Sequence, residues 1–325
     1  MKIVFLDKGS LDRGDIKFDS LKSQCETWIN YDETKIDDVV SRIKDADIVI
    51  TNKVQFTESI MSHCGQLKLI CVAATGTNNI DLHAAEKHNI PVCNVAGYAT
   101  HSVVQHVYSL ILALHNNLIN YQQRVNEKAW DKAKHFCLLN YPISELYGKT
   151  LGIIGYGELG RAVAEVGKAF GLKLLIAESL KQQNSAKHQL EGRIPIAEVL
   201  QQADIISLHC PLTEQTKNLI NKKALTMMKP GSFLINTARG GIVNEHDLLE
   251  ALNNGTISGA ALDVLHEEPP KHNPLIEAKL ENLIITPHIA WASQASRQKL
   301  VNEITKNIAA FKQGIERNIV TNSGN

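Results

Sequence analysis

The amino-acid sequence predicts an α/β fold built from two doubly wound parallel sheets. The first observation is that short, continuously apolar runs alternate with helix-length amphipathic segments along the 325 residues. Strands that are apolar at every position are typical of parallel sheets covered by helices on both faces. The second observation is the length, because a domain usually has about 100–200 residues. We therefore expect two domains of the same class.

The strand candidates fall into two groups. In the first group they are residues 2–6, 47–50, 67–73 and 91–95, with an amphipathic stretch at 80–88. In the second group they are residues 150–154, 173–177, 204–208, 232–236, 258–263 and 283–286. The last helix candidate, 293–313, follows the final strand and is placed to return to the first group. The first domain would then be discontinuous in sequence.

The same sequence features occur in the same order in both groups of strand candidates. The tripeptide Ala-Asp-Ile begins an apolar run at residue 46 and again at residue 203, and a Thr-Glu pair follows each run. The next apolar run leads to Gly76 in the first group and to Gly240 in the second. The repetition indicates two similar α/β units. Chance resemblance between two buried-strand units is the alternative.

The composition excludes several classes of protein. With 34 basic and 34 acidic side chains the formal net charge is zero, which favours neither nucleic acid nor an acidic partner. No apolar run reaches the roughly 18 residues that a membrane helix needs, and Asp7 comes too early for a signal peptide. The six cysteines form no Cys-x-x-Cys pair and do not cluster with histidines at zinc-ligand spacing. We expect reduced cysteines, no metal site and a cytoplasmic protein.

A glycine pattern follows the first strand of the second group. Its residues are Gly155, Tyr156, Gly157, Glu158, Leu159 and Gly160. In a strand–turn–helix unit the first glycine allows a tight turn, the second lets the backbone approach a pyrophosphate, and the third lets helix and strand pack closely. The helix N-terminus then presents N–H groups to the phosphates. Because strand, helix and second strand are all present, the pattern predicts a dinucleotide site.

Glu178 ends the second strand of this unit. A carboxylate there accepts hydrogen bonds from the ribose hydroxyls of NAD and repels the 2′-phosphate of NADP. No arginine follows it directly in the sequence. We therefore expect NAD(H) to be preferred over NADP(H). The alternative for Glu178 is a solvated strand end.

Three later segments place polar groups after strands, where open α/β sheets bind ligands. Arg239 offers a two-pronged donor to a carboxylate, Glu268 lies in an acidic run, and His288 suits acid–base chemistry near neutral pH. Their alternatives are a surface salt bridge, a solvated charge run and a structural histidine. Together they supply what hydride transfer to a 2-oxo acid requires, with the hydride coming from NADH. A further segment, His209-Cys210-Pro211, is predicted to line the cofactor pocket.

These motifs resemble the D-isomer-specific 2-hydroxyacid dehydrogenases over essentially the whole chain. The specific parts are the glycine pattern, the run 236–241, Asp263 with Glu268-Pro269, and Pro287-His288. Within the family the sequence is most similar to the glycerate dehydrogenase (hydroxypyruvate reductase) branch, through residues 50–53, 73–81 and 92–98. Departures are Gln105, where the family often has glutamate, and Glu178, where aspartate is commoner.

The resemblance implies roles for individual residues. His288 would be the general acid, Glu268 its carboxylate partner, and Arg239 the residue that orients the substrate. Further contacts would come from Asp263 and Thr100 near the nicotinamide, from Thr237 and Ala238 at the cofactor, and from the backbone amides of Thr75 and Gly76 at the substrate carboxylate. Lys53 is a candidate substrate contact, with a surface lysine as the alternative.

The resemblance also implies an architecture and a reaction. Residues 99–287 would form a Rossmann-type NAD-binding domain, and residues 1–98 with 288–325 a flavodoxin-like substrate domain, with a cleft between them. Helices from residue 101 to about 133 would make a homodimer. The expected reaction is reduction of hydroxypyruvate or glyoxylate to D-glycerate or glycolate by NADH. The alternatives are a D-lactate-type dehydrogenase of other 2-oxo acids and a non-catalytic NAD-sensing protein.

Overall fold

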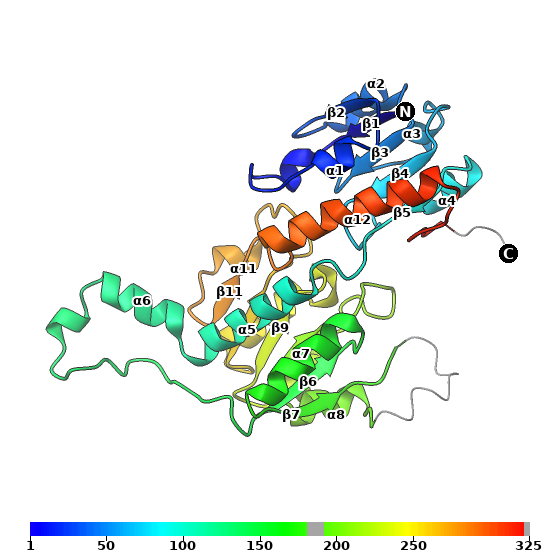
Figure 1. The fold of residues 1–325 in the computed structure, drawn as a ribbon. Coiled ribbons are helices and arrows are strands. Elements are labelled where there is room, and N and C mark those ends of the chain that lie inside the picture. The colour runs from blue at the N-terminus through cyan, green and yellow to red at the C-terminus, as the bar shows by residue number, and fades with distance from the viewer. Residues whose placement is uncertain (181–191, 322–325) are drawn as a thin grey trace. The chain divides into compact units, whose positions relative to one another are not determined.

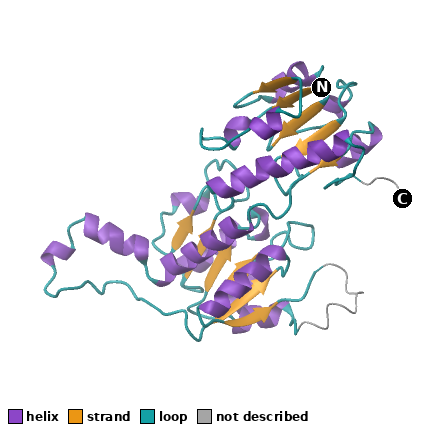
Figure 2. Cartoon of the chain, in the orientation of Figure 1, coloured by secondary structure: helices purple, strands orange, loops and turns teal. Residues whose placement is uncertain are grey.

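The chain divides into two compact units, Met1–Ala99 with Trp291–Asn325 and Thr100–Ala290. The computed structural model describes residues 1–180 and 192–321. Each unit contains one all-parallel sheet with helices packed on it (Figure 1, Figure 2). The predicted α/β class with two parallel sheets is confirmed. Within the described residues, no helix combines the length and apolarity that a membrane crossing needs.

The sheet of the first unit has five strands. In spatial order they are β2 (Thr27–Asn30), β1 (Lys2–Phe5), β3 (Ile48–Thr51), β4 (Leu69–Val72) and β5 (Val92–Cys93). Its helical elements are η1 (Lys8–Ser10), α1 (Asp19–Lys22), η2 (Ile36–Asp38), α2 (Val39–Ile43), α3 (Glu58–Met61), α4 (Leu82–Lys87) and α12 (Gln294–Lys312). The order 2-1-3-4-5 is the flavodoxin-like one.

Both faces of this sheet are covered, which explains its continuously apolar strands. Val4 and Val49 pack on one face with side chains of α2, α3 and α4. Ile3 and Ile48, the next residues along the same strands, pack on the other face with α1 and α12. Among the strands of the described residues, β2 is the one that was not predicted. It is an edge strand whose Thr-Trp-Ile-Asn sequence is half exposed, so it lacks an apolar run.

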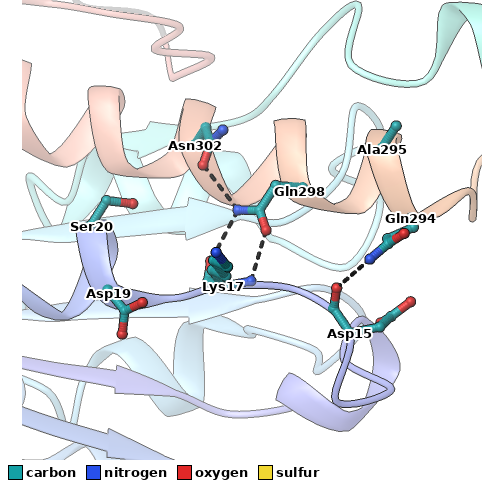
Figure 3. A pocket seen from close by; sticks show the side chains of 8 residues that line it. All are labelled: Asp15, Lys17, Asp19, Ser20, Gln294, Ala295, Gln298 and Asn302. Atoms are coloured by element: carbon teal, nitrogen blue, oxygen red, sulfur yellow. Dashed lines mark hydrogen bonds between the residues drawn. The ribbon is translucent and has the colours of Figure 1, made fainter.

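Helix α12 is fastened to the loop before α1 by polar side chains (Figure 3). Arg297 is 8 % exposed and makes two hydrogen bonds to the Asp15 carboxylate, at 2.7 and 2.6 Å. Gln298 accepts from the backbone N–H of Lys17 at 2.7 Å and donates to its carbonyl at 3.0 Å. Five of the residues that line the shallow hollow between helix and loop are joined by hydrogen bonds: Asp15, Lys17, Gln294, Gln298 and Asn302. These bonds hold the end of the chain in the first unit.

The sheet of the second unit has six strands. In spatial order they are β7 (Lys173–Ile176), β6 (Thr150–Ile154), β8 (Ile205–Leu208), β9 (Phe233–Asn236), β10 (Gly259–Leu262) and β11 (Leu283–Ile285). Its helical elements are α5 (Thr100–His115), α6 (Leu118–Asn126), η3 (Trp130–Lys132), α7 (Glu158–Ala169), α8 (Ile196–Gln202), α9 (Lys222–Met227), η5 (Gly240–Ile242), α10 (Glu245–Asn253) and α11 (Pro274–Glu277).

Counted from the first strand of each unit, the second sheet repeats the order of the first and adds one strand. A Rossmann sheet has a third strand outside the second. Here only the single bridge between Ala177 and Ile194 occupies that position in the described part of the chain. Helices α8, α9 and α10 bury apolar side chains such as Val199, Leu225 and Leu248 on one face of the sheet.

Candidate active site

Apart from Thr100, which begins α5, the predicted site residues of the second unit follow the carboxyl ends of β6, β7, β8, β9, β10 and β11. All strands of this sheet are parallel, so these ends meet at one edge. Ligands of open α/β sheets bind at this edge. The fold therefore collects segments that are far apart in the sequence.

The three glycines of the turn after β6 have different neighbours. Gly155 has φ +98°, and a Cβ there would lie 2.4 Å from the backbone nitrogen of Cys210. A Cβ on Gly160 would lie 2.2 Å from the carbonyl oxygen of Gly155. Both positions thus exclude a side chain because protein backbone fills the space. A Cβ on Gly157 would meet no heavy atom within 4 Å, so its backbone faces open space.

Helix α7 begins directly after this open glycine. Gly157 is its N-cap, and Glu158 is its first residue. The first N–H groups of a helix have no acceptor within the helix and carry a partial positive charge. Glu158 accepts a hydrogen bond from the hydroxyl of Thr100, which brings Thr100 to the glycine turn. Its carboxylate adds a negative charge beside the expected phosphate position.

Two arginines beside Tyr156 of the glycine turn were not predicted from the sequence. Glu178 is exposed, and its backbone N–H donates to the Ile194 carbonyl at 2.9 Å. The guanidinium of Arg161 lies 4.5 Å from the ring centre of Tyr156, and that of Arg193 lies 5.7 Å from it. Arg193 comes close because its neighbour Ile194 bridges to Ala177, and not through sequence proximity. Two guanidinium groups therefore lie beside Tyr156 of the glycine turn.

Two buried polar atoms at the same edge fit a bound dinucleotide. The Nδ1 atom of His209 and the Oγ1 atom of Thr237 have no hydrogen-bond partner within the described residues. Burial lowers the pKa of His209 to about 4, so its imidazole is neutral at pH 7. Burial also raises the pKa of Cys210 to about 11, which keeps it a thiol. Buried polar groups are normally hydrogen-bonded, so an open glycine turn flanked by two unpaired atoms is suited to a polar ligand.

The strongest acid–base feature is the pair formed by His288 and Glu268. The Nδ1 atom of His288 lies 2.6 Å from Oε2 of Glu268. The other carboxylate oxygen accepts from the backbone N–H of Leu265 at 2.9 Å, which fixes the carboxyl group. Both side chains are partly exposed, His288 at 29 % and Glu268 at 34 %. A carboxylate on Nδ1 stabilises the imidazolium and leaves proton transfer to Nε2.

Asp263 holds the backbone around this histidine. Its side chain is 1 % exposed and accepts from the N–H groups of Ile289 and Ala290, both at 2.9 Å. Its carbonyl accepts from the N–H of His288 at 2.8 Å. These bonds explain why residues 288–290 belong with the second unit. One lone pair on Oδ2 remains for the predicted nicotinamide contact, which stays a prediction.

Arg239 lies on a tightly held segment after β9. The buried Asn236 side chain donates to the Arg239 carbonyl at 2.9 Å and accepts from the Ala238 N–H at 3.0 Å. A Cβ on Gly240 would lie 1.9 Å from the backbone carbon of Leu265. The Arg239 segment is therefore packed against the turn that fixes Glu268. The guanidinium donates to the Ala238 carbonyl at 2.6 Å through Nη1.

The remaining predicted residues are in the first unit. Lys53 is exposed and follows β3, and its backbone N–H donates to the buried Asp7 carboxylate at 2.7 Å. Thr75 and Gly76 follow β4. The Thr75 hydroxyl donates to the Val95 carbonyl at 2.8 Å, which fixes the start of this loop. Their roles toward the substrate stay predictions.

Comparison with known proteins adds to this geometry. A family model described as D-isomer specific 2-hydroxyacid dehydrogenase, NAD binding domain, matches residues 108–290. The chain is 46 % identical over 321 residues to a putative 2-hydroxyacid dehydrogenase of Haemophilus influenzae, covering 98 % of this chain and 100 % of that one. It is 42 % identical over 323 residues to glycerate dehydrogenase of Methylorubrum extorquens, with 98 % of each chain covered.

A solved structure is similar over the same length. D-lactate dehydrogenase from Aquifex aeolicus, complexed with NAD and lactic acid, has a TM-score of 0.82 and 30 % identity. The match covers 99 % of this chain and 100 % of that one. The resemblance inferred from the motifs is confirmed, and with it an oxidoreductase activity and a nucleotide-binding domain. The chain belongs to the D-isomer specific 2-hydroxyacid dehydrogenase family.

Proposed function

We propose that this protein reduces hydroxypyruvate or glyoxylate to D-glycerate or glycolate, using NADH. The observation that supports it most is the 2.6 Å contact between His288 and Glu268 in the unit that carries the glycine turn. Similarity to glycerate dehydrogenase at 42 % identity supports the choice of substrate. D-lactate-type activity on other 2-oxo acids is the second candidate, supported by the similarity to D-lactate dehydrogenase.

In the proposed reaction, His288, Glu268 and Arg239 each have a separate role. NADH supplies the hydride when it is bound. His288 donates the Nε2 proton to the oxygen of the substrate carbonyl, and Glu268 stabilises the imidazolium through Nδ1 before transfer. Arg239 offers two parallel N–H groups to the substrate carboxylate, which orients the carbonyl. In the reverse direction His288 accepts the hydroxyl proton at Nε2.

The glycine turn after β6 supports the proposed binding of NADH. The backbone of Gly157 and the first N–H groups of α7 would hold the pyrophosphate, with Thr237 and His209 as polar partners. Tyr156, Leu159, Pro211 and Ala238 would complete the lining of the site. Glu178 would bind the ribose hydroxyls and favour NADH over NADPH. Because Arg161 and Arg193 lie over Tyr156, we expect this preference to be moderate.

A substrate panel tests the proposal. Loss of NADH absorbance is measured with hydroxypyruvate, glyoxylate, pyruvate and 2-oxoisocaproate, and then with NADPH. Fast turnover of hydroxypyruvate or glyoxylate with NADH is expected, while a preference for pyruvate would support the D-lactate-type alternative. NADH binding without turnover of any substrate would support the NAD-sensing alternative.

A variant tests the role of the histidine. His288→Gln should lower kcat by about 10²–10⁴-fold, because a positioned general acid contributes that much. NADH binding, followed by fluorescence titration, should change less than about twofold. Turnover equal to that of the unchanged protein would remove His288 from the mechanism.

We also propose a homodimer formed through residues 118–139, the segment that contains α6 and η3. This segment extends away from the sheet of the second unit (Figure 1). It exposes large apolar side chains, including Phe136 at 90 %, Leu139 at 79 % and Leu118 at 62 %. Exposed apolar groups of this size gathered on one segment are typical of a surface that a partner covers.

Light scattering tests the dimer. Leu118→Asp and Phe136→Asp should shift the mass from dimer to monomer. Ile276→Asp replaces another exposed apolar residue of the same unit, on α11, and serves as the control that should stay dimeric. A monomer in the unchanged protein at micromolar concentration would contradict the proposal.

A further inference from the structure

A chain of hydrogen bonds connects helix α5 to the turn that carries His288. His106 lies on α5, and its Nε2 atom is 2.9 Å from the hydroxyl oxygen of Thr286. Thr286 directly follows β11, and its hydroxyl is 2.6 Å from Oδ1 of Asp263. The His106 side chain is 17 % exposed, so the contact is largely shielded from water.

The direction of each hydrogen bond follows from the chemistry of the groups. The Asp263 carboxylate only accepts, so the Thr286 hydroxyl donates its single proton to it. The hydroxyl oxygen must then accept from His106, which requires a proton on Nε2 of that ring. The same nitrogen lies 3.5 Å from Oδ1 of Asp263. His106 therefore orients both the hydroxyl and the carboxylate.

The orientation of the Asp263 carboxylate matters because it holds two backbone N–H groups next to His288. Its two oxygens accept from the backbone N–H groups of Ile289 and Ala290, on the C-terminal side of His288. His288 itself has φ +54°, a left-handed conformation that residues with a Cβ seldom adopt. A rotation of the Asp263 side chain would release the two amides and let the backbone of His288 relax.

We propose that His106 is a positioning residue for the reaction. It acts through Thr286 and Asp263 to hold the backbone of His288, so that Nδ1 meets Glu268 and Nε2 is aimed for proton transfer. The inference rests on the proposed function, in which His288 is the acid. It predicts that loss of the Nε2–H donor impairs the chemical step and leaves cofactor binding unchanged.

The test compares variants that remove or retain each polar group. His106→Leu removes the donor, while His106→Gln retains an N–H at a similar reach. Thr286→Val removes the hydroxyl, and Thr286→Ser retains it. His101→Gln, at an exposed position of the same helix, is the control. For each purified protein we would measure kcat and KM for the 2-oxo acid, and the NADH dissociation constant by fluorescence.

We expect His106→Leu and Thr286→Val each to lower kcat about tenfold, with NADH affinity within twofold of the unchanged protein. His106→Gln and Thr286→Ser should keep at least half of the original kcat. The double variant His106→Leu with Thr286→Val should be no worse than either single one, because the two residues act in one chain. The proton NMR signal of the His288 Nδ1–H, assigned with His288→Gln, should shift in His106→Leu.

Other results would overturn the inference. Full kcat in His106→Leu would show that the contact positions nothing. Equal losses in His106→Leu and His106→Gln would indicate a packing role, as would a loss of NADH affinity that parallels the loss of kcat. Activity retained in His288→Gln would instead refute the proposed function, and with it the role of His106. The two failures are therefore distinguishable.

Discussion

The two units share the order of their first five strands and the same polar contact at the start of the sheet, but they differ at the turn that follows the first strand. Asp47 precedes β3 and accepts from the N–H of Lys2 at 2.7 Å, and Lys68 donates to it at 2.7 Å. Asp204 precedes β8, and it accepts from the N–H of Thr150 at 2.8 Å and from Lys229 at 3.0 Å. The repeated signals in the sequence thus mark equivalent strands with equivalent contacts.

The difference lies at the carboxyl end of the first strand. The pairing of β1 with β3 and of β6 with β8 makes Asp7 the equivalent of Gly155. Asp7 is 6 % exposed, and its carboxylate accepts from the N–H of Asn52 at 2.9 Å. Gly155 has no side chain, and its backbone packs directly on the equivalent segment at Cys210. One unit thus fills this position with its own carboxyl side chain, whose pKa is raised by burial, whereas the other leaves an open glycine turn beside it.

The largest expected effect comes from substituting the glycines of the open turn. Gly155→Ala would force a Cβ against Cys210, at a backbone φ that alanine rarely adopts. It should lower the melting temperature by several degrees and weaken NADH binding about 100-fold. Gly157→Ala is the matched variant, because its Cβ meets no protein atom. It should keep the melting temperature and weaken NADH binding about tenfold.

Calorimetry and fluorescence titration check this pair. A Gly157→Ala protein that binds NADH normally would show that the open face of the turn is not the pyrophosphate site. A Gly155→Ala protein of unchanged stability would show that the close approach to Cys210 is not required.

The second effect is the loss of folding stability at acidic pH. Burial lowers the pKa of His115 to about 4, whereas an unfolded histidine titrates near 6.5. The unfolded chain binds the proton more tightly, so stability from this residue is full above pH 6.5 and falls as pH drops toward 4. His115→Gln should remove up to about 3 kcal/mol of this pH dependence. Urea unfolding at pH 7 and pH 4.5 measures it.

His83→Gln, at an exposed position of the first unit, is the control for this series. It should leave the difference in unfolding free energy between the two pH values as it is in the unchanged protein. If His115→Gln behaves like the control, the buried histidine is not the source of the acid sensitivity.

The third effect concerns the choice of cofactor. Glu178→Gln removes the charge that repels a 2′-phosphate and should lower the NADH over NADPH preference in kcat/KM about tenfold. Arg193→Gln removes positive charge near Tyr156 and should raise the preference severalfold. Binding of 2′,5′-ADP by calorimetry provides a readout without turnover. Changes in the same direction for both variants would contradict the opposed roles.

The smallest effect would test the equivalence of the two units. Asp47→Asn and Asp204→Asn each weaken one backbone contact and one lysine contact, and each should cost about 1 kcal/mol of unfolding free energy. The lysine partner and the backbone N–H lower the pKa of both carboxyls, so this stability should be full above about pH 3.8 and be lost progressively as the pH falls from there through the lowered pKa of the folded state. Costs that differ by more than about 2 kcal/mol would show that the shared geometry conceals different roles.

Most strands and the glycine turn can be predicted from the sequence because each depends mainly on the chemistry of residues close together in the chain. Strands buried on both faces are predominantly apolar, so the runs at Ile48–Thr51 and Ile205–Leu208 were evident. The turn at Gly155 could be predicted because its positive φ and the backbone packed against it leave room only for glycine, which is visible in the sequence. Strand β2 was missed because an edge strand does not need an apolar run.

The class of fold, the glycine turn and the residue types of the proposed catalytic pair could be predicted from the sequence, since each has a recognisable local pattern. Which distant groups meet became evident only from the folded structure: Arg193 at Tyr156, Asp7 at Asn52, and His106 at Thr286. The physical reason is that these contacts depend on strand order and register. Those are set by the packing of the whole sheet, and no local pattern records them.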